Sequence, residues 1–368
     1  MKIAIVLNTS WNVYNFRMGL IKALQEENHQ VVVIAPRDEY SDKIIAQGCE
    51  FHELTMDSRG ANALKDLGLV FELIKIYKRV KPDVALHYTI KPNIYGSIAC
   101  RWLNIPAVNN VCGLGTVFLK KNFVSKVASW MYRVSFKYPK KVFFQNKNDK
   151  RLFIKNGLVD EKIADILPGS GIDLSRFVQS DFKRNDKFTF LLISRLIHDK
   201  GILEYIEAIR LLKAKGMDAK FQILGAKDTE HKRGIKEEII DEWISSNTIE
   251  YLGKVEDVRE FINNADCVVL PSYREGTPKS LLEAASSGKP IVTTDVPGCR
   301  DVVDHQINGL LCKMKDPEDL AKKLEIMASF NDDELKSLGL NGRKKVENQF
   351  DEKIVIKKYL NTIQELLS

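Results

Sequence analysis

Two acidic residues, Glu275 and Glu283, lie in the segment REGTPKSLLE (274–283). The apolar run CVVLPS (267–272) precedes them, so we expect a buried strand, then a loop carrying Glu275, then a helix carrying Glu283. Pro278 suits the first position of that helix, because its missing amide hydrogen would be unpaired there anyway. Backbone amides at such a helix N-terminus favour binding of a phosphate group. The amides concerned belong to Gly276, Thr277, Lys279 and Ser280.

The two carboxylates would serve different parts of one ligand. Helical side chains lean toward the helix N-terminus, so Glu283 can reach back beside a bound phosphate and accept hydrogen bonds from ribose hydroxyls. Glu275, on the loop, would lie where a sugar attached to that phosphate begins. The alternative is a capped helix with two surface acids, and the segment alone leaves both interpretations open.

Two cations follow another apolar run, FTFLLIS (188–194). Arg195 comes directly after this run, and Lys200 precedes the next helical pattern. A guanidinium fork and a compact ammonium group together suit a diphosphate, although both residues would be equally ordinary as solvated surface cations. Gly225 ends the run AKFQILG (219–225), where a glycine lets the backbone approach a ligand or simply makes a turn.

Short apolar runs alternate with amphipathic helical patterns along the whole chain. This alternation indicates parallel sheets covered by helices on both faces. Two such series predict an α/β fold of two doubly wound, Rossmann-like domains facing across a cleft, with ligands outside the carboxyl ends of the strands. The expected strands are 2–8, 30–36, 83–88, 107–111 and 141–145 in the first half, and 188–194, 219–225, 248–253, 267–272 and 290–295 in the second.

The segment LPGSGIDLSRF (167–177) interrupts this pattern and predicts the joint between the domains. We expect an N-terminal domain of residues 1–168 and a C-terminal domain of residues 169–350. A final helix, 351–368, has no strand after it and is expected to pack back onto the first domain.

Composition restricts the class of protein. Of 368 residues, 44% are hydrophobic and 29% are charged, which is typical of a globular protein. No apolar run reaches the roughly 20 residues needed to cross a bilayer, and the first residues lack the features of a secretory signal. The six cysteines are scattered without Cys-x-x-Cys spacing, which predicts reduced thiols in the cytoplasm.

The net charge of +7 is concentrated in the first half. Residues 1–180 contain 26 Lys and Arg against 16 Asp and Glu, whereas residues 181–368 contain 30 against 33. This surplus suits an anionic partner, and no nucleic-acid-reading motif accompanies it. Within 119–151, ten cations interleave with apolar residues such as Trp130, which suits an anionic membrane surface. The alternative is that the apolar residues face the core while the cations are solvated.

The spacing Glu-x7-Glu after an apolar strand, with S-R-L-x4-K-G upstream, resembles the retaining glycosyltransferases of family 4. GIDLSRF (171–177) and PGCRDVVDHQINGLLC (297–312) also resemble the second domain of that family. The resemblance implies the GT-B fold, donor diphosphate binding by Arg195 and Lys200, ribose binding by Glu283 and donor-sugar binding by Glu275. Donor contacts would extend to Gly225 and to the loop and helix start, namely Gly276, Thr277, Pro278, Lys279 and Ser280.

The first half resembles a narrower subgroup, the bacterial transferases that extend a sugar on undecaprenyl diphosphate, N-acetylgalactosaminyltransferases among them. The loop after its first strand, NTSWNVYNFRMGLIKAL (8–24), lacks the Gly-Gly pair common in the family. Its part YNFRMGLIKAL (14–24) and the segment GLGTVF (113–118) carry the resemblance to this subgroup. Arg17 and Lys91 would meet the anionic acceptor, but each suits a surface cation as well, and His87 suits a core or a catalytic histidine. The resemblance implies an acceptor site of Asn15, Phe16, Arg17, Lys91, Asn93, Gly113 and Gly115.

Together these features predict an enzyme that moves an N-acetylhexosamine from a UDP-sugar to a lipid-diphosphate-linked sugar, and the family resemblance implies that the transfer proceeds with retention. No Asp-x-Asp sequence occurs, so Arg195, Lys200 and the helix dipole are expected to offset the leaving diphosphate's charge without a metal or other cofactor. The expected location is the cytoplasm, at the inner face of the plasma membrane. The alternatives are a nucleotide-sugar epimerase of similar fold and a non-catalytic nucleotide-sugar-binding subunit.

Overall fold

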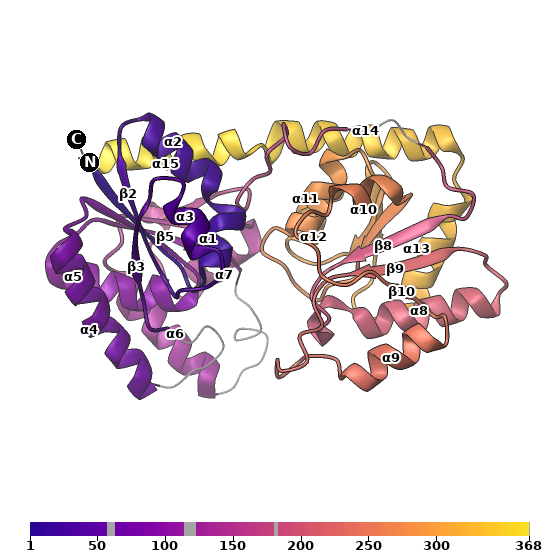
Figure 1. Cartoon of the computed structure of the whole chain (residues 1–368), viewed down its shortest axis with the longest axis horizontal. Coiled ribbons are helices and arrows are strands. Elements are labelled where there is room, and N and C mark those ends of the chain that lie inside the picture. Colours follow the sequence, from indigo (N-terminus) through magenta and orange to yellow (C-terminus); the bar gives the residue numbers. More distant parts are fainter. Residues whose placement is uncertain (57–62, 114–122, 180–182, 368) are drawn as a thin grey trace. The chain divides into compact units, whose positions relative to one another are not determined.

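The computed structural model describes residues 1–56, 63–113, 123–179 and 183–367 (Figure 1). The chain divides into two compact units, each with its own sheet and core. Residues 1–170 and 352–368 form the first unit, and residues 171–351 form the second. No described helix is long and apolar enough to cross a membrane.

The first unit is built on a parallel sheet with the strand order β3-β2-β1-β4-β5-β6-β7. Its central strands are buried along almost their whole length, because helices cover both faces of the sheet, and most of their residues are apolar. The strands are β1 (Lys2–Val6), β2 (Gln30–Ala35), β3 (Glu50–Glu53), β4 (Val84–Tyr88), β5 (Ala107–Val111), β6 (Lys141–Phe144) and β7 (Ala164–Ile166).

Two sets of helices cover the first sheet, each with its own hydrophobic core. One core includes residues of α4 (Ala63–Val80), α5 (Ser97–Leu103), α6 (Phe123–Ser135) and α7 (Lys147–Lys155). The other includes residues of α1 (Ser10–Phe16), α2 (Met18–Glu26), α3 (Ser41–Ile45) and α15 (Glu352–Leu367). The last helix of the chain therefore completes the core of the first unit.

The second unit has a parallel sheet with the strand order β10-β9-β8-β11-β12-β13. Its strands are β8 (Thr189–Ile193), β9 (Lys220–Leu224), β10 (Glu250–Tyr251), β11 (Cys267–Leu270), β12 (Ile291–Thr294) and β13 (Gly309–Cys312). One core includes α8 (Ile202–Ala214), α9 (Glu237–Ser245) and α13 (Pro317–Ser329). The other includes α10 (Arg259–Asn264), α11 (Lys279–Ser286) and α12 (Cys299–Val302). Helix α14 (Asp332–Gln349) contributes to both cores.

The prediction of two doubly wound, Rossmann-like α/β domains is confirmed. In each sheet the strand order reverses once, between β1 and β4 in the first unit and between β8 and β11 in the second. Ligands of doubly wound sheets bind outside the carboxyl ends of the strands at this switch point. The residues that follow β1, β4, β8 and β11 are therefore the ones to inspect for a site.

Candidate active site

In the second unit, the structure gathers the predicted site residues at one edge of the sheet. β8 lies between β9 and β11, with Ile193 paired to Leu224 and Leu192 paired to Val269. Because the strands are parallel and in register, the segments that follow them emerge side by side. Arg195 follows β8 and Glu275 follows β11. Lys200 ends a short 3-10 turn, η4 (His198–Lys200), that leads into α8.

A glycine brings the η4 turn against the segment after β11. Gly201 has φ +72°, and a Cβ atom there would lie 2.0 Å from the Pro271 carbonyl oxygen, so only glycine fits. The contact is extended by two hydrogen bonds to the Asp199 carbonyl oxygen, from the Tyr273 amide at 2.9 Å and the Ser272 hydroxyl at 3.1 Å. These contacts place Lys200 beside the loop that carries Glu275.

Lys200 and Glu275 form an ion pair between Nζ and Oε1. Both side chains are largely enclosed, with 22% of Lys200 and 13% of Glu275 exposed. The Glu275 amide donates to the Pro297 carbonyl oxygen at 3.2 Å, which fixes the loop against the turn after β12. An anionic ligand near Lys200 would compete with the Glu275 carboxylate and leave that carboxylate available to sugar hydroxyls.

Arg195 also has a carboxylate partner, one that the sequence did not suggest. Its Nη1 donates to Asp228 Oδ2 at 3.1 Å, and Arg195 is 56% exposed while Asp228 is only 8% exposed. Gly225 has φ +151°, and a Cβ there would lie 1.9 Å from the Ser194 carbonyl oxygen. The neighbouring backbone therefore requires this glycine, which lets the segments after β8 and β9 cross closely.

Helix α11 begins one residue later than predicted. Pro278, with φ −72° and ψ 115°, is the N-cap residue, and the helix starts at Lys279. An amide donates to a carbonyl three or four residues earlier, so the first-turn amides of Lys279 and Ser280 point out of the N-terminus. The loop residues Gly276 and Thr277 lead directly into this helix start.

Glu283 lies one turn into α11, and its environment favours the neutral form. Burial raises the pKa of its carboxyl group from 4.5 to about 7. Lys279 and Arg176 act in the opposite direction, whereas the charge of Asp257 raises the pKa further. A carboxyl group held near its titration point can accept hydrogen bonds from hydroxyl groups once it is ionised.

In the first unit, Arg17 is buried between α1 and α2 and is not a surface cation. Only 4% of it is exposed, and its guanidinium lies 4.2 Å from the centre of the Tyr88 ring. Its Nη2 is 3.7 Å from Cys112 Sγ, and its Nε has no hydrogen-bond partner. Tyr88 ends β4, so this guanidinium lies at the switch point of the first sheet.

The other predicted acceptor residues come from three places: Lys91 and Asn93 follow β4, Asn15 and Phe16 belong to α1, and Gly113 follows β5. Lys91 precedes a π-helical turn, η1 (Pro92–Gly96), and such turns are frequent at functional sites. Asn93 is fully buried and donates to the Asn110 carbonyl oxygen at 2.8 Å. Asn15 Nδ2 donates to the Trp11 carbonyl oxygen, and the Phe16 ring packs on the Trp11 ring. Gly113 has φ +124°, and Gly115 lies outside the described residues.

His87 is a core histidine. It is fully buried, its Nε2 lies 2.8 Å from the Tyr77 hydroxyl, and its Nδ1 lies 2.9 Å from Asn109 Oδ1. The amide oxygen of Asn109 is an acceptor, so Nδ1 carries the proton and Nε2 accepts from Tyr77. Burial lowers the pKa of His87 from 6.5 to about 4, so the ring is neutral at physiological pH.

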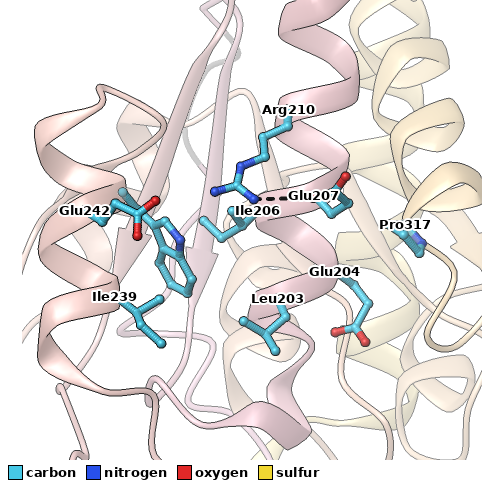
Figure 2. A pocket seen from close by; sticks show the side chains of 9 residues that line it. Leu203, Glu204, Ile206, Glu207, Arg210, Ile239, Glu242 and Pro317 are labelled. Carbon is cyan, nitrogen blue, oxygen red and sulfur yellow. Dashed lines mark ion pairs between the residues drawn. The ribbon is translucent and has the colours of Figure 1, made fainter.

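A groove of about 490 Å³ lies between α8 and α9. Figure 2 shows Leu203 and Ile239 on its walls and the ion pair of Arg210 with Glu207. Within the described ranges, no three His, Cys, Asp or Glu side chains are arranged to hold a metal ion.

Comparisons with known proteins identify the family. A model of group 1 glycosyl transferases matches residues 175–345, and a model of glycosyl transferase 4-like proteins matches residues 2–146. An N,N'-diacetylbacillosaminyl-diphospho-undecaprenol alpha-1,3-N-acetylgalactosaminyltransferase of Campylobacter jejuni is 31% identical, over 100% of this chain and 99% of its own length. The chain belongs to the family 4 glycosyltransferases.

Other glycosyltransferases support this assignment. A UDP-Gal:alpha-D-GlcNAc-diphosphoundecaprenol alpha-1,3-galactosyltransferase of Escherichia coli is 26% identical, over 80% of this chain and 78% of its own. Among solved structures, Anabaena Alr3699/HepE in complex with UDP and glucose has a TM-score of 0.81 and 17% identity, covering 99% of both chains. The structural likeness shows that this glycosyltransferase has the GT-B fold.

Proposed function

We propose that this glycosyltransferase moves an N-acetylhexosamine, such as N-acetylgalactosamine, from a UDP-sugar to a sugar linked to undecaprenyl diphosphate. The transfer retains the configuration of the anomeric carbon, needs no metal ion, and serves the assembly of a surface polysaccharide or glycan. The observation that carries the proposal is the ion pair of Lys200 with Glu275, at the sheet edge where the N-terminus of α11 also lies.

The site supplies the charges that breaking a sugar–diphosphate bond requires. Negative charge develops on the leaving UDP, and Arg195, Lys200 and the dipole of α11 offset it. Glu275, released from Lys200 by the incoming phosphate, accepts hydrogen bonds from the transferred sugar. Glu283 accepts hydrogen bonds from the ribose. The acceptor hydroxyl attacks from the face that the diphosphate leaves, and a phosphate oxygen takes its proton, so no side-chain nucleophile is needed.

The names of relatives support the substrates. The Campylobacter jejuni relative transfers N-acetylgalactosamine to a sugar on diphospho-undecaprenol, and the Escherichia coli relative uses UDP-Gal with a sugar of the same kind of lipid. The same carrier lipid in two relatives favours an undecaprenyl-diphosphate-linked acceptor. The buried Arg17, with an Nε atom that lacks a partner, is the natural counter-charge for that diphosphate in the first unit.

A surface of the first unit fits an anionic membrane. Trp130 on α6 is 62% exposed and follows the exposed Lys126 by one helical turn, with the exposed Lys137 just beyond the helix. Tyr132 and Phe136 face the core instead, so only part of the apolar content of this segment is buried. We propose that α6 holds the enzyme at the inner face of the plasma membrane, where its acceptor lies.

A transfer assay tests the proposal. Purified protein is incubated with UDP-sugars and synthetic undecaprenyl-diphosphate sugars, and products are read by mass spectrometry. We expect the acceptor mass to rise by one N-acetylhexosamine, and Glu275→Gln to reduce the rate at least about a hundredfold. Arg210→Gln, a substitution on α8 in the groove beside α9, should keep the wild-type rate, because Arg210 pairs with Glu207 and not with a predicted site residue. An isomerised UDP-sugar without transfer would identify an epimerase, and donor binding without any reaction would identify a binding subunit.

A further inference from the structure

A third cation, Arg233, lies at the sheet edge of the second unit where Arg195 and Lys200 also lie. Arg233 belongs to the segment after β9, which pairs with the segment after β8 through backbone hydrogen bonds. The His198 amide donates to the Arg233 carbonyl oxygen at 2.9 Å, and the Ile235 amide donates to the Leu196 carbonyl oxygen at 3.1 Å. Arg233 is thereby fixed opposite the η4 turn that ends in Lys200.

The guanidinium of Arg233 is directed back into the predicted site. Its Nη1 forms an ion pair with Asp199 Oδ2, and Asp199 immediately precedes Lys200. The carbonyl oxygen of the same Asp199 accepts from the Tyr273 amide, two residues before Glu275. Arg233 is therefore connected to the Lys200–Glu275 pair by a short chain of direct contacts.

Arg195 and Arg233 belong to the two paired segments after β8 and β9, where Ile197 is bridged to Gly234. Burial lowers the pKa of the Arg233 guanidinium, and the positive charge of Arg195 lowers it further. Each guanidinium is held by one carboxylate, Asp228 for Arg195 and Asp199 for Arg233. Two adjacent cations become favourable neighbours when a dianion binds between them, and a diphosphate offers two anionic groups to such a pair.

We infer that Arg233 is a third donor-binding cation, which leaves Asp199 and donates to an oxygen of the nucleotide diphosphate when the donor binds. The inference rests on the proposed function, because it takes the ligand of this edge to be a nucleoside diphosphate. It adds a residue that neither the Glu-x7-Glu spacing nor the segment around Arg195 and Lys200 contains. Three cations then face the diphosphate. The leaving group is held by residues that follow both β8 and β9.

The test compares a ligand with and without the diphosphate. The wild-type affinity for UDP, GDP and ADP is measured by calorimetry, and that for the matching nucleoside by NMR titration. Arg233→Gln should weaken diphosphate binding about 10- to 100-fold, leave nucleoside binding within about twofold, and make the salt dependence shallower. Arg233→Lys should lie between the two proteins, because it keeps the charge but loses the fork.

The control is Arg210→Gln, which removes an arginine that also pairs with a carboxylate of the second unit, Glu207 at 3.5 Å (Figure 2). It should leave both affinities unchanged. Wild-type diphosphate binding in Arg233→Gln, or an equal loss of diphosphate and nucleoside, would overturn the inference while the proposed function stands. A wild-type protein that binds none of the three nucleotides would overturn both.

A third arm separates two sources of diphosphate. A short-chain prenyl diphosphate replaces the nucleotide in the same titration. Arg233→Gln should retain the wild-type affinity for this lipid analogue. A loss confined to the prenyl diphosphate would assign Arg233 to the acceptor and overturn the inference.

Discussion

At the scale of single residues, the candidate site consists of cations held by carboxylates. Lys200 pairs with Glu275, and Arg195 pairs with Asp228. Each cation is already paired with a carboxylate. When a diphosphate binds, it replaces that carboxylate as the anionic partner of the cation. Desolvated charges are costly when unpaired, and this pairing keeps the site stable while no ligand is bound.

Removing Lys200 should affect both stability and activity. Lys200→Ala leaves the Glu275 carboxylate, only 13% exposed, without its cation, so we expect the free energy of unfolding to fall by about 1–3 kcal/mol. The transfer rate should fall at least about a hundredfold. Lys215→Ala, which removes a cation from an exposed pair with Glu325, should cost less than about 1 kcal/mol. Equal losses in denaturant unfolding of the two variants would contradict the enclosed pair.

The raised pKa of Glu283 predicts that donor binding depends on pH. Its pKa in the folded protein is about 7, so the ionised form that accepts ribose hydroxyls becomes the major form above that pH. Affinity for a UDP-sugar, whose own phosphates do not titrate in this range, should rise up to roughly tenfold between about pH 6 and 8. Calorimetry at several pH values measures this. Glu283→Gln should give a flat profile, and an equally steep profile in that variant would exclude Glu283 as its source.

The same group also affects stability, and the sign follows from proton binding. The folded protein retains a proton on Glu283 between pH 4.5, the ordinary pKa, and about pH 7, whereas the unfolded chain releases it. The contribution of this group to the free energy of unfolding therefore falls as pH rises through that window. In Glu283→Gln this fall should be absent from denaturant unfolding measured across the window. A fall of unchanged size would show that the carboxyl group is not held near neutrality.

At the scale of elements, two glycines and a helix start position the chemistry. The sequence predicted the strands that precede Arg195 and Glu275, and the structure places both residues at one sheet edge as parallel strands require. The sequence did not predict the pairing of Arg195 with Asp228, because neighbouring strands bring the two residues together although they are far apart in the sequence. Pro278 was placed one position too far into α11, since a proline suits both the N-cap and the first turn.

Gly201 should tolerate no side chain. Gly201→Ala combines a left-handed backbone with a Cβ only 2.0 Å from a carbonyl oxygen, so we expect a loss of about 3 kcal/mol or more in unfolding free energy. Gly216→Ala is the matched control, because its φ is +84° but no atom lies within 4 Å of the added Cβ. It should cost about 1 kcal/mol. Similar costs in the two variants would show that the segment after β11 can shift to make room for a Cβ atom at position 201.

Helix α6 should carry membrane binding. Changing Trp130→Ser, Lys126→Glu and Lys137→Glu together removes an interfacial aromatic residue and reverses two exposed charges. Partitioning onto phosphatidylglycerol vesicles should fall about tenfold or more in a sedimentation assay, with unchanged circular dichroism. Lys336→Glu with Lys344→Glu reverses two exposed charges on α14 and serves as the control. Undiminished sedimentation of the α6 variant would disprove this membrane surface.

At the scale of the whole molecule, alternation of strands and helices was enough to predict two doubly wound domains. The strand orders were not readable, since periodicity does not say which strands are neighbours. Short strands such as β3, β7 and β13 were not predicted, because three or four residues are too few to give a clear period. The acceptor residues stay predictions, since their order along the chain says nothing of how they meet a lipid.

The last helix should matter to one unit only. Val355, Tyr359 and Ile363 of α15 belong to the core formed with β1 and β4, and the Tyr359 hydroxyl accepts from Asn110 Nδ2 at 2.8 Å. Deleting 352–368 should raise amide hydrogen exchange throughout the first sheet and leave exchange in β8, β9 and β11 unchanged. Protection lost equally in both sheets would show that the two units do not have separate cores.

The most direct test of the account is a crystal structure of the protein with a UDP-sugar bound. We predict that the diphosphate lies against the N-terminus of α11, within hydrogen-bond distance of Lys200 Nζ and an Arg195 nitrogen, with Glu275 released toward the sugar. A nucleotide bound elsewhere, or a diphosphate that leaves the Lys200–Glu275 pair intact and out of contact, would contradict the proposed function.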